Sequence, residues 1–127
     1  MNQFKINIKA TNFQLTPELE NYVDSKLSHV QKFLNLQGDQ EVIAYVEIEK
    51  VAGAHHRQGN IFRAEINLNF RGTTFRASET REEFFVAIDE VVQELIRQIR
   101  KTKERRIDLV RRGGKMLKKL LRFGRED

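Results

Sequence analysis

Apolar and polar residues alternate along the start of the chain, which is the pattern of a strand with one face buried and one face in water. In the segment 4–10 every second residue is apolar, and three later segments repeat this alternation, at residues 41–50, 60–71 and 73–78. Gly72, between the last two segments, suits a tight turn. The pattern predicts four strands that each present one side to a core.

Two other segments repeat apolar residues every three or four positions, which is the period of an amphipathic helix. The first begins at Thr16, a residue type that caps helices, followed by Pro17, and it extends to about residue 35. The second begins with Thr80 and Glu83, which have the spacing of a capping box. Each segment therefore predicts a helix with one buried side.

The second helix is expected to extend beyond its own buried side. Its apolar stripe ends near Ile99, yet residues that favour helix continue through Arg106. The end of this helix should therefore project past the core.

The predicted order of elements is β-α-β-β-β-α. Two strands joined through a helix pair in parallel, whereas strands joined by short turns pair antiparallel. Since the alternation leaves one sheet face polar, both helices must cover the other face. The sequence predicts an α+β fold, an open-faced two-layer sandwich with a four-stranded mixed sheet and two helices on one face.

Positive charge is concentrated in the last quarter of the chain. Residues 97–127 include 13 basic and 4 acidic residues, whereas residues 1–50 and residues 51–96 each include 5 basic and 7 acidic residues. Such a field favours a polyanionic partner, with nucleic acid ahead of an anionic membrane. The alternative is a solvated charged tail that only aids solubility.

The sequence offers little for catalysis or for metal binding. The chain has no cysteine, and its adjacent His55 and His56 lie in a predicted loop without acidic residues at ligand spacing. It also contains no catalytic motif and no phosphate-binding loop. We expect a protein that is not an enzyme and that uses no cofactor, no metal and no small-molecule substrate.

The chain length of 127 residues is that of one domain. No stretch reaches the roughly 20 apolar residues of a membrane span, and the alternating N-terminus is unlike a signal peptide. These features predict a cytoplasmic protein.

Basic residues recur along the end of the second helix more densely than a helix dipole requires. On a straight helix, Arg97, Lys101 and Arg105 lie along one line, a suitable path for phosphates. The alternative is a solvated helix end. The predicted RNA-binding residues belong to this helix, to the first helix and to the polar side of the strands: Arg97, Arg100, Lys101, Lys103, Arg105, Arg106, Lys26, Lys5, Lys9, Arg63, Arg71 and Arg76.

Aromatic residues that could stack on bases are not evident. Five of the nine phenylalanines, Phe4, Phe62, Phe70, Phe75 and Phe84, fall at predicted core positions. Recognition is therefore expected to depend on backbone shape and charge, which favours folded RNA over a single-stranded sequence.

Two blocks of sequence resemble the ribosome hibernation-promoting factors and ribosome-associated translation inhibitors, in their short form. The blocks are FKINIKATNFQLTPELENYVDSKLSHVQKFL and FRASETREEFFVAIDEVVQELIRQIRKTKERR, and the resemblance covers about residues 3–106. Its most specific piece is AID at 87–89 followed by LIRQIRK at 95–101. At 83–85 the chain has EFF where the family commonly has Asp-Met-Tyr, so a tyrosine hydroxyl is absent.

The resemblance implies a protein that binds the small ribosomal subunit and its ribosomal RNA in the channel for messenger RNA and tRNA. It implies inhibition of translation by steric occlusion, and protection of idle ribosomes in stationary phase or stress. The RNA contacts would include the matching positions Arg97, Arg100, Lys101 and Lys103, with Lys26 on the first helix. Off the ribosome the protein would be a monomer.

The resemblance divides the chain into residues 1–106, the ribosome-binding α/β domain, and residues 107–127, a basic tail. We expect this tail to be flexible alone and ordered on RNA, with a membrane-surface anchor as the competing interpretation. Only 21 residues follow Arg106, too few for the C-terminal domain with which long members pair two ribosomes. Two other functions stay open, a protein-binding regulator that uses its sheet edge and a general binder of structured RNA.

Overall fold

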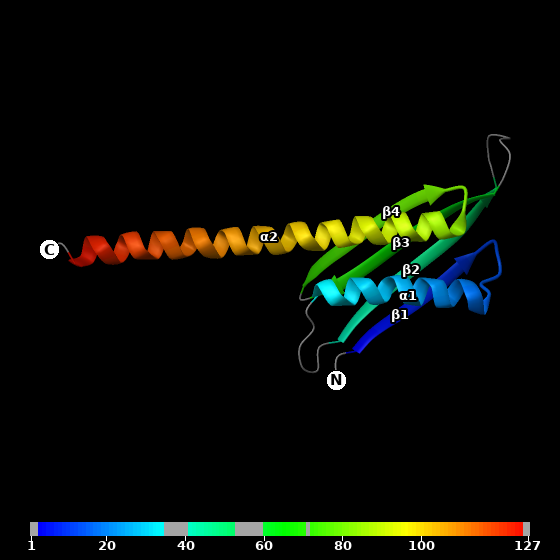
Figure 1. The fold of residues 1–127 in the computed structure, drawn as a ribbon, viewed down its shortest axis with the longest axis horizontal. Coiled ribbons are helices and arrows are strands. Elements are labelled where there is room, and N and C mark those ends of the chain that lie inside the picture. The colour runs from blue at the N-terminus through cyan, green and yellow to red at the C-terminus, as the bar shows by residue number, and fades with distance from the viewer. Residues whose placement is uncertain (1–2, 35–40, 53–59, 71, 126–127) are drawn as a thin grey trace.

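The computed structural model describes residues 3–34, 41–52, 60–70 and 72–125, and Figure 1 shows how the elements follow one another. The elements are β1 (Gln3–Thr11), α1 (Pro17–Leu34), β2 (Glu41–Ala52), β3 (Asn60–Phe70), β4 (Thr73–Arg81) and α2 (Phe84–Arg125). Their order is the predicted one.

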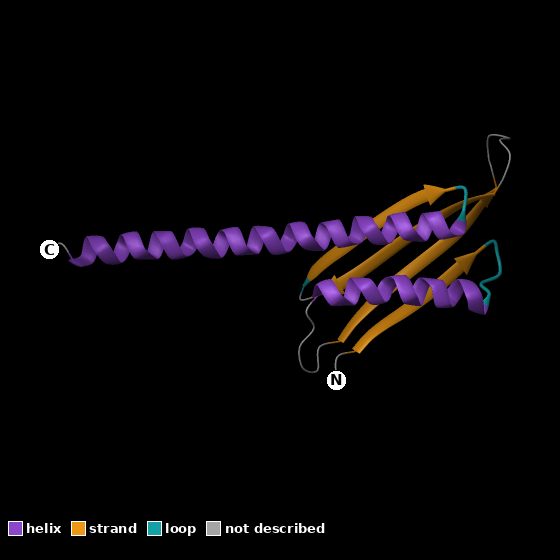
Figure 2. Ribbon diagram, viewed as in Figure 1, coloured by secondary structure: helices purple, strands orange, loops and turns teal. Residues whose placement is uncertain are grey.

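The four strands form one mixed sheet in the order β1-β2-β3-β4. β1 and β2 pair in parallel, because α1 carries the chain back to the same end of the sheet, and the other two pairs are antiparallel. Both helices lie on one face of the sheet (Figure 2), and the other face is not covered by any described element. The predicted open-faced sandwich is confirmed.

The core lies between this sheet face and the helices. Strand register places Ile8, Val46, Ile66 and Ala77 in one row across the sheet. The three residues on β2, β3 and β4 are buried, and Ile8 on the edge strand is half-buried. The helices add Val23, Leu27, Val30, Leu34, Phe84, Ala87, Ile88, Val91, Val92, Leu95 and Ile99. Alternation in the strands and helical spacing therefore meet in a single apolar layer.

Of the two predicted helix starts, one is confirmed and the other is wrong. Thr16 caps α1 as predicted, since its Oγ1 accepts a hydrogen bond from the Leu19 backbone N–H at 3.3 Å. The capping box predicted at Thr80 is wrong, because this residue lies in β4 opposite Arg63 and α2 begins only at Phe84. Ladder hydrogen bonds hold the threonine in the strand, a conformation that its branched side chain favours.

α2 is longer than the sequence indicates. Ile99 is the last buried residue among the described side chains of α2, as predicted, but the helix continues through Gly113 and Gly114 to Arg125 and projects from the sheet (Figure 1). Each glycine disfavours helix by about 1 kcal/mol, and the strong helix formers around them outweigh this cost. Helix therefore stands where a flexible tail is predicted, while a functional boundary after Arg106 stays a prediction.

The projecting part of α2 exposes apolar side chains. Ile107, Leu109, Val110 and Met116 are all more than half exposed, because no other described element reaches them. Basic residues between them keep this stretch polar overall. No helix within the described ranges is long and apolar enough to cross a membrane.

Two isoleucines of α2 test where the core ends. Ile99 is 2% exposed, whereas Ile107 on the same helix is 51% exposed. Ile99→Ala should lower the free energy of unfolding by about 2–5 kcal/mol, because it removes buried methylenes and leaves a cavity. Ile107→Ala should change it by less than about 0.5 kcal/mol. Urea unfolding followed by circular dichroism compares the variants, and equal losses would show that the projecting helix is packed.

Candidate nucleic-acid interface

The two helices form a layer whose two ends carry opposite charge. α1 and α2 lie side by side and run in the same direction, so their N-terminal ends share one end of the layer (Figure 1). Acidic residues gather there, with Glu18 and Glu20 in the first turn of α1 and Glu82 and Glu83 just before α2. Basic residues gather where α1 ends and α2 continues. Each helix dipole favours this arrangement, which leaves the layer with one basic end.

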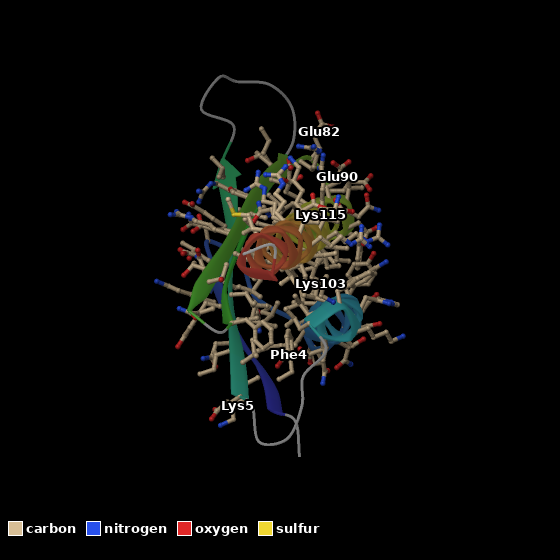
Figure 3. All side chains as sticks on the ribbon, turned by 90° about the vertical axis from the view of Figure 1, so that its left-hand side faces the viewer. Phe4, Lys5, Glu82, Glu90, Lys103 and Lys115 are labelled. Carbon is tan, nitrogen blue, oxygen red and sulfur yellow. The ribbon has the colours of Figure 1, made fainter. Side chains whose placement is uncertain are left out.

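The basic end consists of Arg97, Arg100, Lys101, Lys103 and Arg105 of α2. Four of them are exposed and Lys103 is half-buried, on the side of α2 that faces α1 (Figure 3). Lys101 and Arg105 follow Gln98 by three and seven positions, and the Gln98 amide donates a hydrogen bond to a backbone carbonyl of β4. With about 3.6 residues per turn, these two cations therefore point to the β4 side.

Contacts within the protein engage two of these cations. The Arg97 guanidinium forms an ion pair with Glu94, one turn earlier in α2. The Arg100 guanidinium lies 5.0 Å from the centroid of the Phe33 ring in α1, a cation–π contact. Lys101, Lys103 and Arg105 form no ion pair with any described residue. These three charges are therefore the ones most open to an anionic partner.

Lys26, the predicted contact on α1, belongs to a cluster that joins the helices. Its Nζ lies 3.3 Å from Asp89 Oδ1 of α2 and 5.4 Å from the Tyr22 ring centroid. The Tyr22 hydroxyl donates a hydrogen bond to the same Asp89 oxygen. Phe85 packs edge-on against the Tyr22 ring at 4.7 Å. Asp89 thus ties α1 to α2 and compensates the charge of Lys26.

This cluster changes the acidity of Tyr22. Burial, the hydrogen bond to Asp89 and the negative charge of that carboxylate together raise the pKa of Tyr22 from 10.0 to about 12. All three effects disfavour the tyrosinate, burial most strongly. The protonated hydroxyl is therefore the form that the folded protein stabilises.

The predicted contacts on the strands lie on the open sheet face, away from the helices. Arg63 and Arg76 each place a guanidinium nitrogen close to the Glu65 carboxylate, at 2.9 and 3.0 Å. Glu65 is only 8% exposed, and Asn67 donates a further hydrogen bond to it at 3.0 Å. That hydrogen bond and the two arginine charges, against the effect of burial, hold the pKa of Glu65 below its usual value. Both arginines thus serve a buried carboxylate.

The two lysines of β1 differ in whether they form an ion pair. Lys5 Nζ lies 3.1 Å from Glu41, whereas Lys9 is exposed and forms no ion pair among the described residues. The open sheet face is consequently close to neutral, and the structure does not bring the strand residues together with the basic end of the helix layer.

Some predicted positions lie outside what the structure describes. Arg71, His55 and His56 are outside the described residues, as is the side chain of Arg106. Among the residues that are described, no group of three or more acidic or histidine side chains could hold a metal ion.

Tyr45 is an exposed aromatic residue that the sequence analysis missed. It is 55% exposed at the centre of the open sheet face, so the prediction of no exposed aromatic residue is wrong. The signal was present in the alternation, because inward-facing Ala44 and Val46 place the residue between them outward.

A family model described as "Sigma 54 modulation protein / S30EA ribosomal protein" matches residues 6–107. A ribosome hibernation promotion factor of Lactococcus lactis subsp. cremoris is 32% identical over 101 residues, which are 80% of this chain and 50% of that protein. A ribosome hibernation promoting factor of Klebsiella oxytoca is 27% identical over 101 residues, which are 80% of this chain and 95% of that protein. The chain thus spans about half the length of the first relative and nearly all of the second.

Two solved structures share the fold. The N-terminal domain of Thermus thermophilus Protein Y superimposes with a TM-score of 0.60 at 28% identity, covering 80% of this chain and 99% of that one. A ribosomal subunit interface protein from Coxiella burnetii gives a TM-score of 0.61 at 16% identity, covering 82% of this chain and 99% of that one. The second likeness concerns the fold alone.

Tyr22→Phe tests the link between the helices. It removes the hydrogen bond to Asp89, so we expect a loss of about 1 kcal/mol in the free energy of unfolding at about pH 8. Because the folded-state pKa is raised, this contribution is complete below the unfolded pKa of about 10 and is lost as the pH rises toward about 12. An absorbance titration of tyrosinate should show a step near pH 12 in the wild type only. Persistence of that step in Tyr22→Phe would contradict the assignment.

Proposed function

Since the chain belongs to the sigma 54 modulation protein / S30EA ribosomal protein family, we propose that it is a ribosome hibernation factor. In this proposal it binds the small ribosomal subunit in the channel for messenger RNA and tRNA and contacts the ribosomal RNA there. It inhibits translation by occupying that channel, and it protects the idle ribosome in stationary phase or stress.

The basic end of the helix layer carries this proposal. Lys101, Lys103 and Arg105 are not neutralised by any described residue, and they lie where α2 leaves the sheet. Lysines supply point charges and the arginine supplies a planar fork of donors, both suited to phosphates. Cations that form no ion pair within the protein can bind RNA by exchanging only water and counterions, so no interaction of the folded protein has to be broken.

The mechanism needs no chemical step. The folded body fills space and the cations hold it against phosphates, so messenger RNA and tRNA are excluded without any bond being made or broken. The projecting part of α2 lengthens the contact, because Arg111, Arg112 and Lys115 are exposed along it. The order in which ligands reach the subunit should therefore decide whether the protein binds.

Pairing through a sheet edge is less favoured by the structure. On the β4 edge, the Gln98 amide occupies the Arg76 carbonyl at 2.8 Å. On the β1 edge, Lys5 and Lys9 face the open side of the sheet, and charged residues of this kind discourage strand addition. Salt separates the two functions, because phosphate contacts weaken steeply with salt and strand pairing does not.

Neutralising two cations of the basic end tests the proposal. Lys101→Gln/Arg105→Gln should weaken binding to the small subunit by about tenfold or more and reduce the log–log salt slope by roughly 1.5 units, because two phosphate contacts are lost. Sedimentation of the protein with purified subunits through a sucrose cushion, at several salt concentrations, measures both quantities. Lys5→Gln/Lys50→Gln removes the same charge from the sheet and should leave binding nearly unchanged.

Two further comparisons sharpen this test. Subunits already loaded with messenger RNA and initiator tRNA should not retain the protein, and an excess of unrelated duplex RNA should compete poorly. If the wild type stays in the supernatant with empty subunits, the proposed function is wrong. If duplex RNA competes as well as subunits do, the protein is a general binder of structured RNA.

A further inference from the structure

Tyr45 occupies an unusual place for an aromatic residue. It stands at the middle of β2 on the open sheet face, with Asn7 of β1 and Asn67 of β3 as its register neighbours. Its side chain is 55% exposed, and no described residue stacks on its ring. Aromatic rings stabilise proteins mainly by burial, so this ring contributes little to the core.

Shallow depressions lie on two sides of the ring. One, of about 220 Å³, is lined by Asn7, Lys9, Tyr45, Glu47 and Asn67 together with Ile8 and Val46. The other, of about 520 Å³, lies toward Ile43 and is also bounded by Tyr45. The ring therefore separates two open spaces, and a planar group can lie against it.

The smaller depression offers a specific pair of polar groups. Lys9 and Glu47 are direct register partners, yet neither forms an ion pair with a described residue. The lysine supplies hydrogen-bond donors and the carboxylate supplies two acceptor oxygens. The site can thus bind an acceptor and two adjacent donors on the edge of one flat ligand.

Neither a nucleic-acid duplex nor a protein fits this face as well. Arg63, Arg76 and Lys5 are already paired with carboxylates, so the face is a poor track for phosphates. Its only sizeable apolar side chains near the ring are Tyr45 and Ile43, among the described residues, whereas a stable protein interface needs an apolar centre within roughly 800 Å² per partner. A single stacked base needs only the ring and its polar neighbours.

We propose that Tyr45 stacks on one unpaired guanine of RNA. Guanine presents an acceptor, O6, beside two adjacent donors, N1–H and the N2 amino group. Lys9 donates to O6, and the Glu47 carboxylate accepts from both donors. The proposal rests on the proposed function only in taking RNA as the partner, and it adds a second contact on the face opposite to the basic end.

Tyrosine fluorescence reports this site directly. The chain has two tyrosines and no tryptophan, so in a Tyr22→Phe variant all emission of this kind comes from Tyr45. A uridine hexanucleotide that carries one guanosine should quench this emission to saturation. The same hexanucleotide with adenosine, cytidine or uridine at that position should quench less at equal concentration. Phosphate contacts at the basic end do not touch Tyr45 and should not quench it.

Substitutions in the 127-residue chain, followed by anisotropy of the labelled oligonucleotide, test the roles of the residues. Tyr45→Thr, which suits an exposed strand position, should weaken binding by about 5- to 100-fold, whereas Tyr45→Phe keeps the ring and should bind nearly as well. Glu47→Gln should remove the preference for guanosine. Since few phosphates are contacted, this binding should change little with salt.

The outcomes separate this proposal from the proposed function. Lys101→Gln/Arg105→Gln should still bind the guanosine oligonucleotide through Tyr45 while losing the small subunit. If no oligonucleotide quenches Tyr45, the site is not an RNA-base site and a protein partner becomes the occupant to test, whether or not the protein sediments with subunits. Equal quenching by all four oligonucleotides would overturn the assignment to guanine.

Discussion

The burial of a single sheet face is the constraint on which the rest of this structure depends. Val46 and Ile66 face the helices, and Leu95 and Ile99 of α2 complete the apolar layer between them. Because both helices are used on that face, the opposite face must be compatible with water. The molecule therefore has two unlike surfaces, an outer helix layer and an open sheet, and each can have its own partner.

Ion pairing distinguishes these two surfaces more than the number of charges does. On the open sheet, Arg63 and Arg76 converge on the buried carboxylate of Glu65, so their charge stabilises the fold. At the basic end of the helix layer, Lys101 and Arg105 have no described counter-charge. A phosphate-lined partner gains most from the second surface, and a small flat ligand gains most from the first. This division supports a directional mode of binding with the helices toward RNA.

The sequence patterns predicted the fold because each apolar pattern can be buried in only one way in a two-layer structure. Alternation in the strands and the stripe that ends at Ile99 required a sheet with helices on one face, and the structure agrees. The predicted start of α2 was wrong because Thr80 pairs with Arg63 in the sheet. This pairing depends on strand register, which cannot be derived from local propensity. The continuation of α2 through Gly113 was not predicted because glycine disfavours helix, whereas in the structure the helix formers around it outweigh this cost.

The candidate site was less predictable than the fold. A helical wheel locates Arg97 and Lys101 on one side, but it does not reveal that Glu94 engages the arginine. The same holds for Arg76, whose partner Glu65 lies on a neighbouring strand and became apparent only from register. The number of charges thus overestimated how many basic side chains of the sheet are available to a partner. The exposure of Tyr45 was not predicted, because only the phenylalanines were considered as aromatic residues.

The most direct measurement of the central claim is a lysine acetylation footprint, read by mass spectrometry, of the protein free and bound to the small ribosomal subunit. If the helix layer faces the ribosomal RNA, Lys101 and Lys103 should be protected while Lys5 on the open sheet face stays reactive. Protection of Lys5 with Lys101 and Lys103 still reactive would contradict the account, because the protein would then bind through its opposite face.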